Sequence, residues 1–293
     1  MVKNLVVNAD DFGMTEGINR GIVDAFQNGI VTSTSLLATM PAFHHAAELA
    51  LKNHLDIGAH ISLTLGTPCT GKGSLAPILR DGQFIDSYRN LFMNIYRGRI
   101  KREDLEYEIE CQIAKIEKNG LRINHINGHQ HILMLPSLLK TIFSLMKKHE
   151  IPFLRVPAEI IKVSSLRSHK GWAFLVLGVL SKYAKFRLNL AGSTLRTSTC
   201  FHGLAFSERM SLKDLMGVLK SVKPGITEIQ CHPGYWDKDF LPAYCQGPFM
   251  RDQELEVLKS IEVINGIAEK NIRLTGYGKL ASELSCKVNS AIA

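Results

Sequence analysis

The sequence predicts an α/β fold in which parallel strands and crossover helices form a closed or nearly closed barrel. Strand-like and helix-like segments alternate through almost all of the 293 residues, which is the order that parallel strands joined by helices require. About six or seven such units follow one another, and none has the glycine-rich turn of a dinucleotide-binding sheet. We therefore expect one barrel domain over residues 1–293 rather than an open Rossmann-type sheet.

Short apolar runs and helical periodicity place the elements of the first half of the chain. The run at residues 5–9 ends in polar residues, as a buried strand does where its carboxyl end opens onto a site. Apolar side chains then recur at helical spacing over residues 15–28, and Asn28 with Gly29 ends this helix. The same reasoning predicts strands at 30–38 and 56–63 and a helix at 43–52. Residues 66–84 are rich in glycine, proline and threonine and are expected to form a lid or binding loop.

The second half continues the alternation with one interruption. The pattern predicts helices at 105–116, 136–149, 212–219 and 253–270, and strands at 123–131, 153–156, 227–232 and 272–274. Residues 157–204 mix polar and apolar segments, and no linker-like composition flanks them. We interpret this stretch as an elaborated insertion within the single domain.

Composition and charge exclude several classes of protein. The chain is 45% hydrophobic and 21% charged, which is typical of a globular protein with a real core rather than a disordered chain. Its net charge of +8 is dispersed, and the densest basic cluster, residues 97–102, lacks the interleaved aromatic residues of a single-strand binding groove. We read this cluster as a solvated face and expect no nucleic-acid partner.

Cysteine spacing and the apolar runs indicate the compartment. The six cysteines include no C-x-x-C pair, and the amino-terminal residues are too short and too acidic for a signal peptide. We therefore expect a cytoplasmic protein. The longest apolar run, residues 172–180, is well short of the roughly 20 residues of a membrane-spanning helix. It predicts a core helix, with surface contact to a membrane as the alternative because basic residues flank it. A homodimer is expected only from the general frequency of symmetric oligomers.

Ionisable side chains gather where the predicted strands end. These side chains are Asp10, Asp11, His60, His129, His131, Arg155 and His232. Each one alone has a structural explanation, since a strand-end aspartate often caps a helix and a lone histidine is often a satisfied core residue. Because parallel strands end at one edge of the sheet, however, we expect these side chains to meet at a common rim.

The adjacent pair Asp10 and Asp11 is expected to divide two tasks. Neighbouring side chains on an extended strand point to opposite faces, so the two carboxylates should have different partners. Asp11 with His60 and His129 would supply one carboxylate and two imidazoles, a set suited to a divalent metal with open positions. The other carboxylate could then take a proton from water, and His232 could act as a general acid.

The segment from His125 to His131 has the densest chemistry in the chain. Its three histidines alternate along one predicted strand and would need three separate buried partners if they were only structural. We therefore expect a metal or substrate site at this segment.

Five motifs together resemble the YdjC-like carbohydrate deacetylases. In chain order they are N-A-D-D-F-G at 8–13, G-I-V-T-S at 29–33, G-A-H at 58–60, N-G-H-Q-H at 127–131 followed by Leu135-Pro136, and E-I-Q-C-H-P at 228–233. Their order and spacing match across most of the chain.

The resemblance implies hydrolysis of the N-acetyl group of an acetylated amino sugar. It further implies a distorted TIM-like (β/α) barrel related to the NodB-type polysaccharide deacetylases, with Mg²⁺ as the divalent metal. Asp11, His60 and His129 look like the metal ligands, Asp10 like the general base and His232 like the acid that protonates the departing amine. Arg155 and His131 are then expected to bind substrate or to orient the catalytic groups.

Two departures leave the metal and the substrate open. Many relatives read H-Q-H-x-H, whereas this chain has leucine at the last position, so whatever the third histidine does elsewhere is absent here. Residues 157–203 are closer to the hopanoid-biosynthesis-associated branch, so the substrate could be a glycolipid instead of a free sugar or oligosaccharide. Zn²⁺ remains an alternative to Mg²⁺, because two imidazoles and one carboxylate suit softer metals better. A non-catalytic carbohydrate-binding protein and a metal-dependent phosphoesterase are the competing hypotheses.

Overall fold

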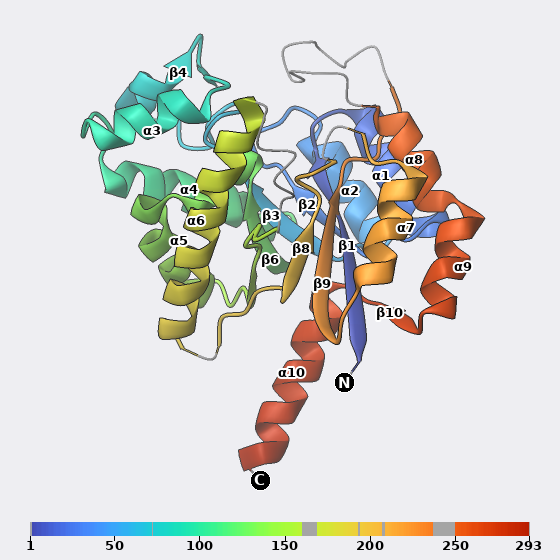
Figure 1. The fold of residues 1–293 in the computed structure, drawn as a ribbon. Helices are drawn as coiled ribbons and strands as arrows, with labels where there is room; N and C mark the ends of the chain where they lie inside the picture. Colours follow the sequence, from blue (N-terminus) through green and yellow to red (C-terminus); the bar gives the residue numbers. More distant parts are fainter. Residues whose placement is uncertain are drawn as a thin grey trace.

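A computed structural model describes residues 2–71, 73–159, 169–192, 194–206, 209–236 and 250–292 of the chain. Its centre is an eight-stranded sheet in which every pairing is parallel (Figure 1). The order is β7-β6-β3-β2-β1-β9-β8, and β10 pairs with the amino-terminal part of β1. The strands are β1 (Lys3–Phe12), β2 (Ser33–Leu36), β3 (Ile57–Ile61), β6 (Ile123–Gly128), β7 (Phe153–Leu154), β8 (Cys200–His202), β9 (Gly225–Cys231) and β10 (Ile272–Leu274).

The two edges of the sheet come together, which makes it a distorted barrel. Phe153 of β7 forms a parallel bridge with Arg196, which lies just before β8. The Leu154 amide donates to the Arg196 carbonyl at 2.9 Å, and the Arg196 amide donates to the Pro152 carbonyl at 2.9 Å. Because these bonds join the β7 edge to the segment that leads into β8, the predicted barrel is confirmed.

Helices surround the barrel, apart from the last, which extends away from the amino ends of the strands (Figure 1). They are α1 (Glu16–Asn28), α2 (Phe43–Lys52), α3 (Tyr88–Tyr96), α4 (Arg102–Lys118), α5 (Pro136–Lys148), α6 (His169–Leu190), α7 (Leu212–Ser221), α8 (Arg251–Lys259), α9 (Ile261–Glu269) and α10 (Tyr277–Ile292). Local sequence fixes several of their ends: the Thr15 hydroxyl caps α1, and Ser211 with Asp214 forms a capping box on α7. The apolar faces of α1 to α9 and most of the almost fully buried β1 make up one large core, and the start of α10 packs with Val6 and Phe153 in a smaller second cluster.

Several elements differ from the sequence prediction, and the strand expected at 30–38 is shorter, at Ser33–Leu36. The strand expected at 123–131 ends at Gly128, and a 3₁₀ helix, η2 (His129–Met134), follows it. The helix expected at 253–270 is two helices, because Ser260 has an extended backbone between α8 and α9. The loop expected at 66–84 contains a 3₁₀ helix, η1 (Gly73–Ile78), and a small antiparallel pair, β4 (Leu79–Arg80) with β5 (Gln83–Phe84). Helices α3 and α10 were not predicted.

The amino end of the sheet is closed by the start of α10. The carboxylate of Asp56 accepts bonds from the Gly278 amide and the Ser33 hydroxyl at 2.9 and 2.8 Å, and from Asn124 at 2.7 Å. Tyr277 packs on the ring of His125 with the centroids 4.3 Å apart. This end is therefore a packed structural layer, and the opposite, carboxyl end of the strands carries the ionisable side chains.

Candidate functional site

Asp11, His60 and His129 form a compact group at the carboxyl end of the sheet. Asp11 lies near the end of β1, His60 in β3 and His129 at the start of η2. One carboxylate oxygen of Asp11 lies 3.6 Å from Nε2 of His60 and 3.6 Å from Nδ1 of His129. The three potential ligand atoms all lie within 4.8 Å of one another. The structure thus brings together the three residues predicted as metal ligands.

The protonation of His60 suits a metal ligand. Burial lowers the pKa of this imidazole, which favours its neutral form, although Asp10 and Asp11 partly oppose that effect. The Asn127 carbonyl oxygen lies 2.6 Å from Nδ1 of His60 and can accept its proton, which leaves a lone pair on Nε2 toward Asp11. Turning the Asn127 amide around would place its NH₂ on Nδ1 instead and its oxygen near Arg155. Metal binding through Nε2 requires the first orientation, so Asn127 would set the tautomer of His60.

Asp11 turns toward this group through an unusual backbone conformation. Its φ angle is 69°, in the left-handed region that residues other than glycine rarely adopt, and the β1–β2 register shifts between Ala9 and Phe12. The two carboxylates were predicted to have different partners because side chains alternate along an extended strand. That reason was wrong, because Asp11 does not have an extended backbone. A local bulge separates the two carboxylates, and their partners do differ.

Asp10 is held by a buried arginine at the end of β7. Arg155 donates from Nη1 to Oδ2 of Asp10 at 2.6 Å and from Nη2 to Oδ1 at 2.9 Å. Its Nε donates to Glu228 of β9 at 2.6 Å. All three side chains are at most 2% exposed. Arg155 therefore fixes the plane of the Asp10 carboxylate, as one of its two predicted roles requires, and Glu228 in turn fixes Arg155.

The charge on Asp10 is strongly stabilised. Burial alone would raise the pKa of this carboxyl, but the Arg155 guanidinium and, to a smaller extent, His60 hold the pKa well below its ordinary value. The Asn8 amide also donates to Oδ1 at 2.8 Å. Asp10 is thus an anion at neutral pH before the reaction begins.

The last predicted rim residue, His232, follows β9 and is held by the first turn of α8. Its backbone amide donates to the Glu254 carboxylate at 2.8 Å, and Arg251 donates to its carbonyl oxygen at 3.5 Å. In the His232 side chain, the ring atom Nε2 lies 3.1 Å from the amide nitrogen of the Gln230 side chain. Burial lowers the pKa of this imidazole to about 4, so it is neutral at neutral pH.

Arg251 connects α8 to the Asp11 group and was missed in the sequence. Its Nη2 donates to Oδ2 of Asp11 at 2.5 Å, and both side chains are nearly buried. Burial would raise the Asp11 pKa, but Arg251 reverses this and the pKa lies well below its ordinary value. A charged pair at the start of a helix ordinarily indicates a solvated face, so Arg251 and Glu254 gave no signal that they line a buried site.

The histidine-rich segment divides into three environments. His125 faces the core of the barrel, where it bonds the Ser35 hydroxyl at 2.9 Å, and a Cβ on Gly58 would come within 2.2 Å of its ring. His129 joins the Asp11 group. His131 has a φ angle of 56°, and its ring lies edge-on to the ring of Phe201, with the two centroids 6.3 Å apart. Burial lowers the pKa of this imidazole to about 3. The prediction that three histidines share one strand was wrong, because the strand ends before two of them.

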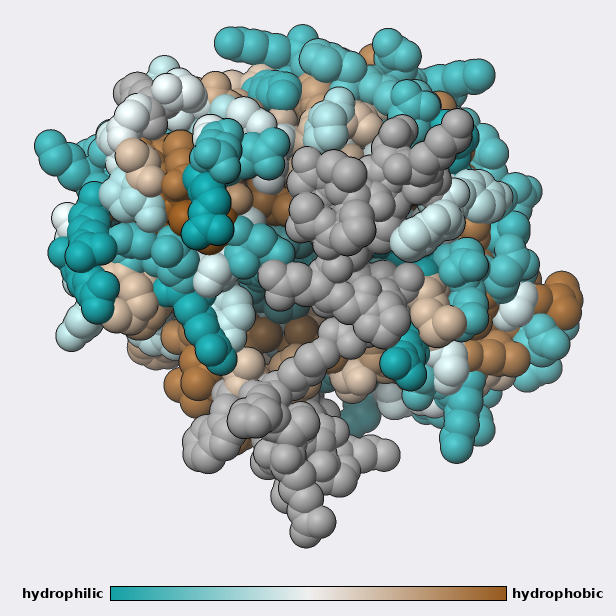
Figure 2. Space-filling view, turned by 90° about the horizontal axis from the view of Figure 1, so that it is seen from above, coloured by the Kyte–Doolittle hydropathy of each residue, from teal (hydrophilic) through white to brown (hydrophobic). Residues whose placement is uncertain are grey.

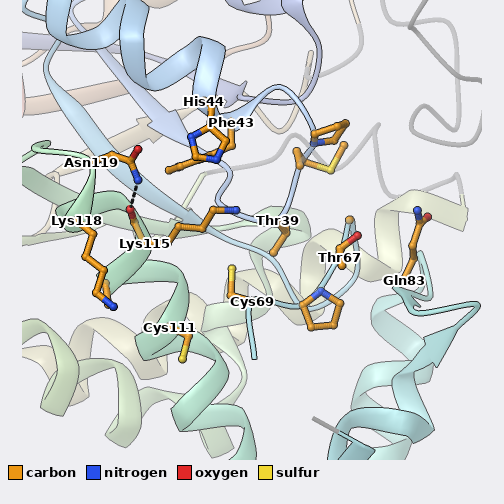
Figure 3. Close-up of a pocket in the computed structure, with 15 residues that line it drawn as sticks. Thr39, Phe43, His44, Thr67, Cys69, Gln83, Cys111, Lys115, Lys118 and Asn119 are labelled. Carbon is orange, nitrogen blue, oxygen red and sulfur yellow. Dashed lines mark hydrogen bonds between the residues drawn. The ribbon is translucent and has the colours of Figure 1, made fainter. Parts of the chain in front are cut away.

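A cavity among the described residues lies outside this group. It has a volume of about 700 Å³ and lies between α2, α4 and the loops that follow β2 and β3 (Figure 3). Lys115 of α4 borders it and donates to the Ala38 carbonyl at 2.6 Å, and Gln83 approaches from the small hairpin. None of the Asp11, His60 or His129 side chains lines this cavity. That residues 66–84 act as a lid or binding loop stays a prediction.

Glu254 allows a test of the buried network through stability. Burial raises the pKa of this carboxyl from 4.5 to about 8, so the folded chain keeps a proton there that the unfolded chain has lost. This residue therefore lowers the free energy of unfolding progressively as the pH rises from 4.5 to 8. Glu254→Gln keeps an acceptor for the His232 amide, so its stability relative to the parent should increase by up to about 1.4 kcal/mol per pH unit in that window.

Denaturant unfolding at pH 5, 6, 7 and 8 would measure the difference between Glu254→Gln and the parent. Glu256→Gln is the matched control, because Glu256 lies on the same helix and its side chain is 72% exposed. The increase in relative stability with pH should be larger for Glu254→Gln than for this control. A flat profile for Glu254→Gln would show that Glu254 is ionised in the folded chain.

Comparisons with known proteins agree on one family. A family model described as YdjC-like protein matches residues 4–269. A carbohydrate deacetylase of Clostridium beijerinckii is 32% identical over 274 residues, which cover 93% of this chain and 98% of that protein. A chitooligosaccharide deacetylase of Klebsiella pneumoniae (strain 342) is 29% identical over 280 residues, which cover 94% and 99%. A crystal structure from Enterococcus faecalis V583, described as a candidate cellobiose-phosphate cleavage protein, superposes with a TM-score of 0.72 at 29% identity and covers 96% and 99%.

Proposed function

The chain belongs to the YdjC-like protein family, and from this premise we propose that it is a metal-dependent carbohydrate deacetylase. The reaction is hydrolysis of the N-acetyl group of an acetylated amino sugar, which releases acetate and the free amine. The observation that carries the proposal is the Asp11, His60 and His129 group with the carboxylate of Asp10 beside it at the same rim. The names of the relatives from Clostridium beijerinckii and Klebsiella pneumoniae support the same class of reaction.

The donor set fits a divalent metal. One buried carboxylate and two imidazoles, one of them neutral by burial, converge within 4.8 Å, and Arg251 and Asn127 orient two of the three ligands. A metal held there would polarise the amide carbonyl and acidify the attacking water. Mg²⁺ follows from the resemblance to the family, whereas the two imidazoles favour Zn²⁺ or another softer metal.

Asp10 is the proposed acceptor for the proton of the attacking water. Its carboxylate is ionised, and Arg155 fixes its plane from one side through two hydrogen bonds. Because Arg155 also pairs with Glu228, the guanidinium stays in place while the charge on Asp10 changes. Arg155 is therefore a positioning residue for the base in this proposal, and its burial leaves it no direct route to a sugar.

His232 is the proposed donor of a proton to the departing amine. Its low pKa means that it is neutral before the reaction begins, so it can act as an acid only after it gains a proton. The attacking water releases a proton in the same turnover, and Asp10 is close enough to His232 to influence its charge. The proton given up by water would thus return to the amine nitrogen, and His131 is proposed to line the sugar site nearby.

Acetate release tests the function directly. The substrates are N-acetylglucosamine, diacetylchitobiose and an acetylglucosaminyl lipid, each with protein that has been stripped of metal and then supplied with Mg²⁺ or Zn²⁺. We expect acetate only when metal is added, and the preferred substrate would distinguish a free sugar, an oligosaccharide and a glycolipid. Phosphate release from sugar phosphates without acetate would instead favour the phosphoesterase. Metal and sugar binding without any hydrolysis would favour a binding protein.

A further inference from the structure

The outer face of helix α6 carries an unpartnered apolar stripe. Its exposed apolar side chains recur every three or four residues, and they are Val176 (56% exposed), Val179 (67%), Tyr183 (37%), Phe186 (59%) and Leu190 (67%). The buried side chains Ser181, Ala184 and Leu188 follow the same spacing. Because successive residues of an α-helix are rotated by about 100°, these two sets lie on opposite sides of α6. The helix therefore packs on the protein with one side and exposes an equally apolar side to its surroundings.

The amino-acid sequence of α6 explains why part of this stripe stays exposed to solvent. Residues 172–180 are apolar in every position apart from Gly178, so the first half of α6 is apolar all round, and a single packing surface leaves Val176 and Val179 uncovered. Figure 1 shows α6 on the outside of the barrel, and it packs against α5 and η2. Figure 2 shows the face at the carboxyl ends of the strands, where hydrophilic side chains predominate among the coloured residues and apolar patches lie between them. The stripe is therefore a feature of the side of the molecule.

The charges around the stripe identify its partner. Helix α6 contains no aspartate or glutamate, and Lys182 and Arg187 lie on the two flanks of the stripe by helical rotation. Two copies of this face against each other would bring like charges together, which disfavours a second copy of the chain. An apolar stripe with basic flanks on a surface helix is instead complementary to a bilayer with anionic headgroups. Among the described helices none is long and apolar enough to cross a membrane, so the contact would lie in the plane of the interface.

We propose that the Val179 and Phe186 face of α6, flanked by Lys182 and Arg187, docks the protein on anionic lipid bilayers. The apolar side chains would enter the boundary between headgroups and acyl chains, and the basic side chains would contact lipid phosphates. Because α6 packs against η2, which carries His129, docking would hold the catalytic rim within one layer of helices from the lipid surface. The inference does not depend on the reaction proposed above.

Co-sedimentation of the full chain with vesicles tests this surface. We expect binding to vesicles of phosphatidylcholine mixed with phosphatidylglycerol, weaker binding as salt rises, and at least about tenfold weaker binding to phosphatidylcholine alone. The double variant Val179→Asp/Phe186→Asp should lose at least about tenfold in affinity for the anionic vesicles. Leu51→Asp/Ile261→Asp is the matched control, because these apolar residues are 50% and 61% exposed on other helices.

Folding and self-association are checked on the same samples. All four replaced side chains are well exposed, so circular dichroism and Tm should match the parent. The proposal is overturned if the parent does not sediment with anionic vesicles, or if both double variants bind equally well. It is also overturned if size-exclusion chromatography shows a dimer that only Val179→Asp/Phe186→Asp breaks and no vesicle binding is present, since a second copy would then cover the stripe.

Discussion

Replacing His60 with alanine should abolish both metal binding and acetate release. His60 contributes one of only two imidazoles to the Asp11 group, and its loss leaves a carboxylate and one histidine. We expect metal affinity to fall by at least about a hundredfold and turnover by at least about a thousandfold at ordinary metal concentration. Metal binding is measured by equilibrium dialysis and by the rise in Tm on adding Mg²⁺ or Zn²⁺, because a ligand that binds the folded chain stabilises it.

His149→Ala is the matched control for this experiment. His149 lies at the end of α5, where its Nδ1 is 2.9 Å from a carboxylate oxygen of Glu117 of α4, and it is not one of the residues that converge on Asp11. It should retain the metal-induced rise in Tm and the acetate release of the parent. If His60→Ala kept the parental metal affinity, the Asp11, His60 and His129 group could not be the metal site, whatever the activity of the variant.

Asp10→Asn should separate the chemistry from metal binding. An amide cannot accept the proton of the attacking water, so we expect kcat to fall by about 10²–10⁴-fold. The metal affinity should stay within a few-fold of the parent, because Asp10 is not one of the three converging ligands. Removing one partner of a buried ion pair lowers the free energy of unfolding by about 3–5 kcal/mol when the other charge is left unpaired. In Asp10→Asn the Arg155 guanidinium still pairs with Glu228, so the loss of stability should be smaller. A lower Tm with a folded chain is therefore expected.

The same chemical change at the opposite end of the sheet provides the control. Asp56 is a partly buried carboxylate, and it accepts hydrogen bonds from the Ser33 hydroxyl, the Asn124 side chain and the Gly278 amide at the amino end of the sheet. Asp56→Asn should lower stability and leave kcat close to that of the parent. Parental turnover in Asp10→Asn would remove Asp10 from the role of base, and a loss of metal affinity equal to that of His60→Ala would make it a ligand instead.

The fold was predictable wherever local patterns and tertiary packing agree. The helix at Phe43–Lys52 and the strand at Ile272–Leu274 have the predicted bounds, since periodicity and flanking turns specify both. The break between α8 and α9 was not predicted, because the apolar pattern of residues 253–270 continues through Ser260 while the backbone turns there. Helix α3 was missed because four of its nine residues are large and exposed apolar side chains, which hide the amphipathic pattern.

The site was predictable as a set of residues but not as a network. Strand ends placed Asp10, Asp11 and His60 at one rim before any contact was known, since the carboxyl ends of parallel strands must meet there. No sequence pattern indicated that Asp11 has a left-handed backbone or that Arg251 reaches it from a helix 240 residues away.

The sequence by itself determined the barrel, the family and the composition of the rim, because periodicity and the spacing of short motifs are properties of the chain alone. Only the tertiary structure decided which partner each charge has: Arg155 for Asp10 and for Glu228, and His60, His129 and Arg251 for Asp11. It also decided that one side of α6 stays exposed. The physical reason is that ion pairing and burial depend on distances across the barrel, and residues far apart in sequence set those distances.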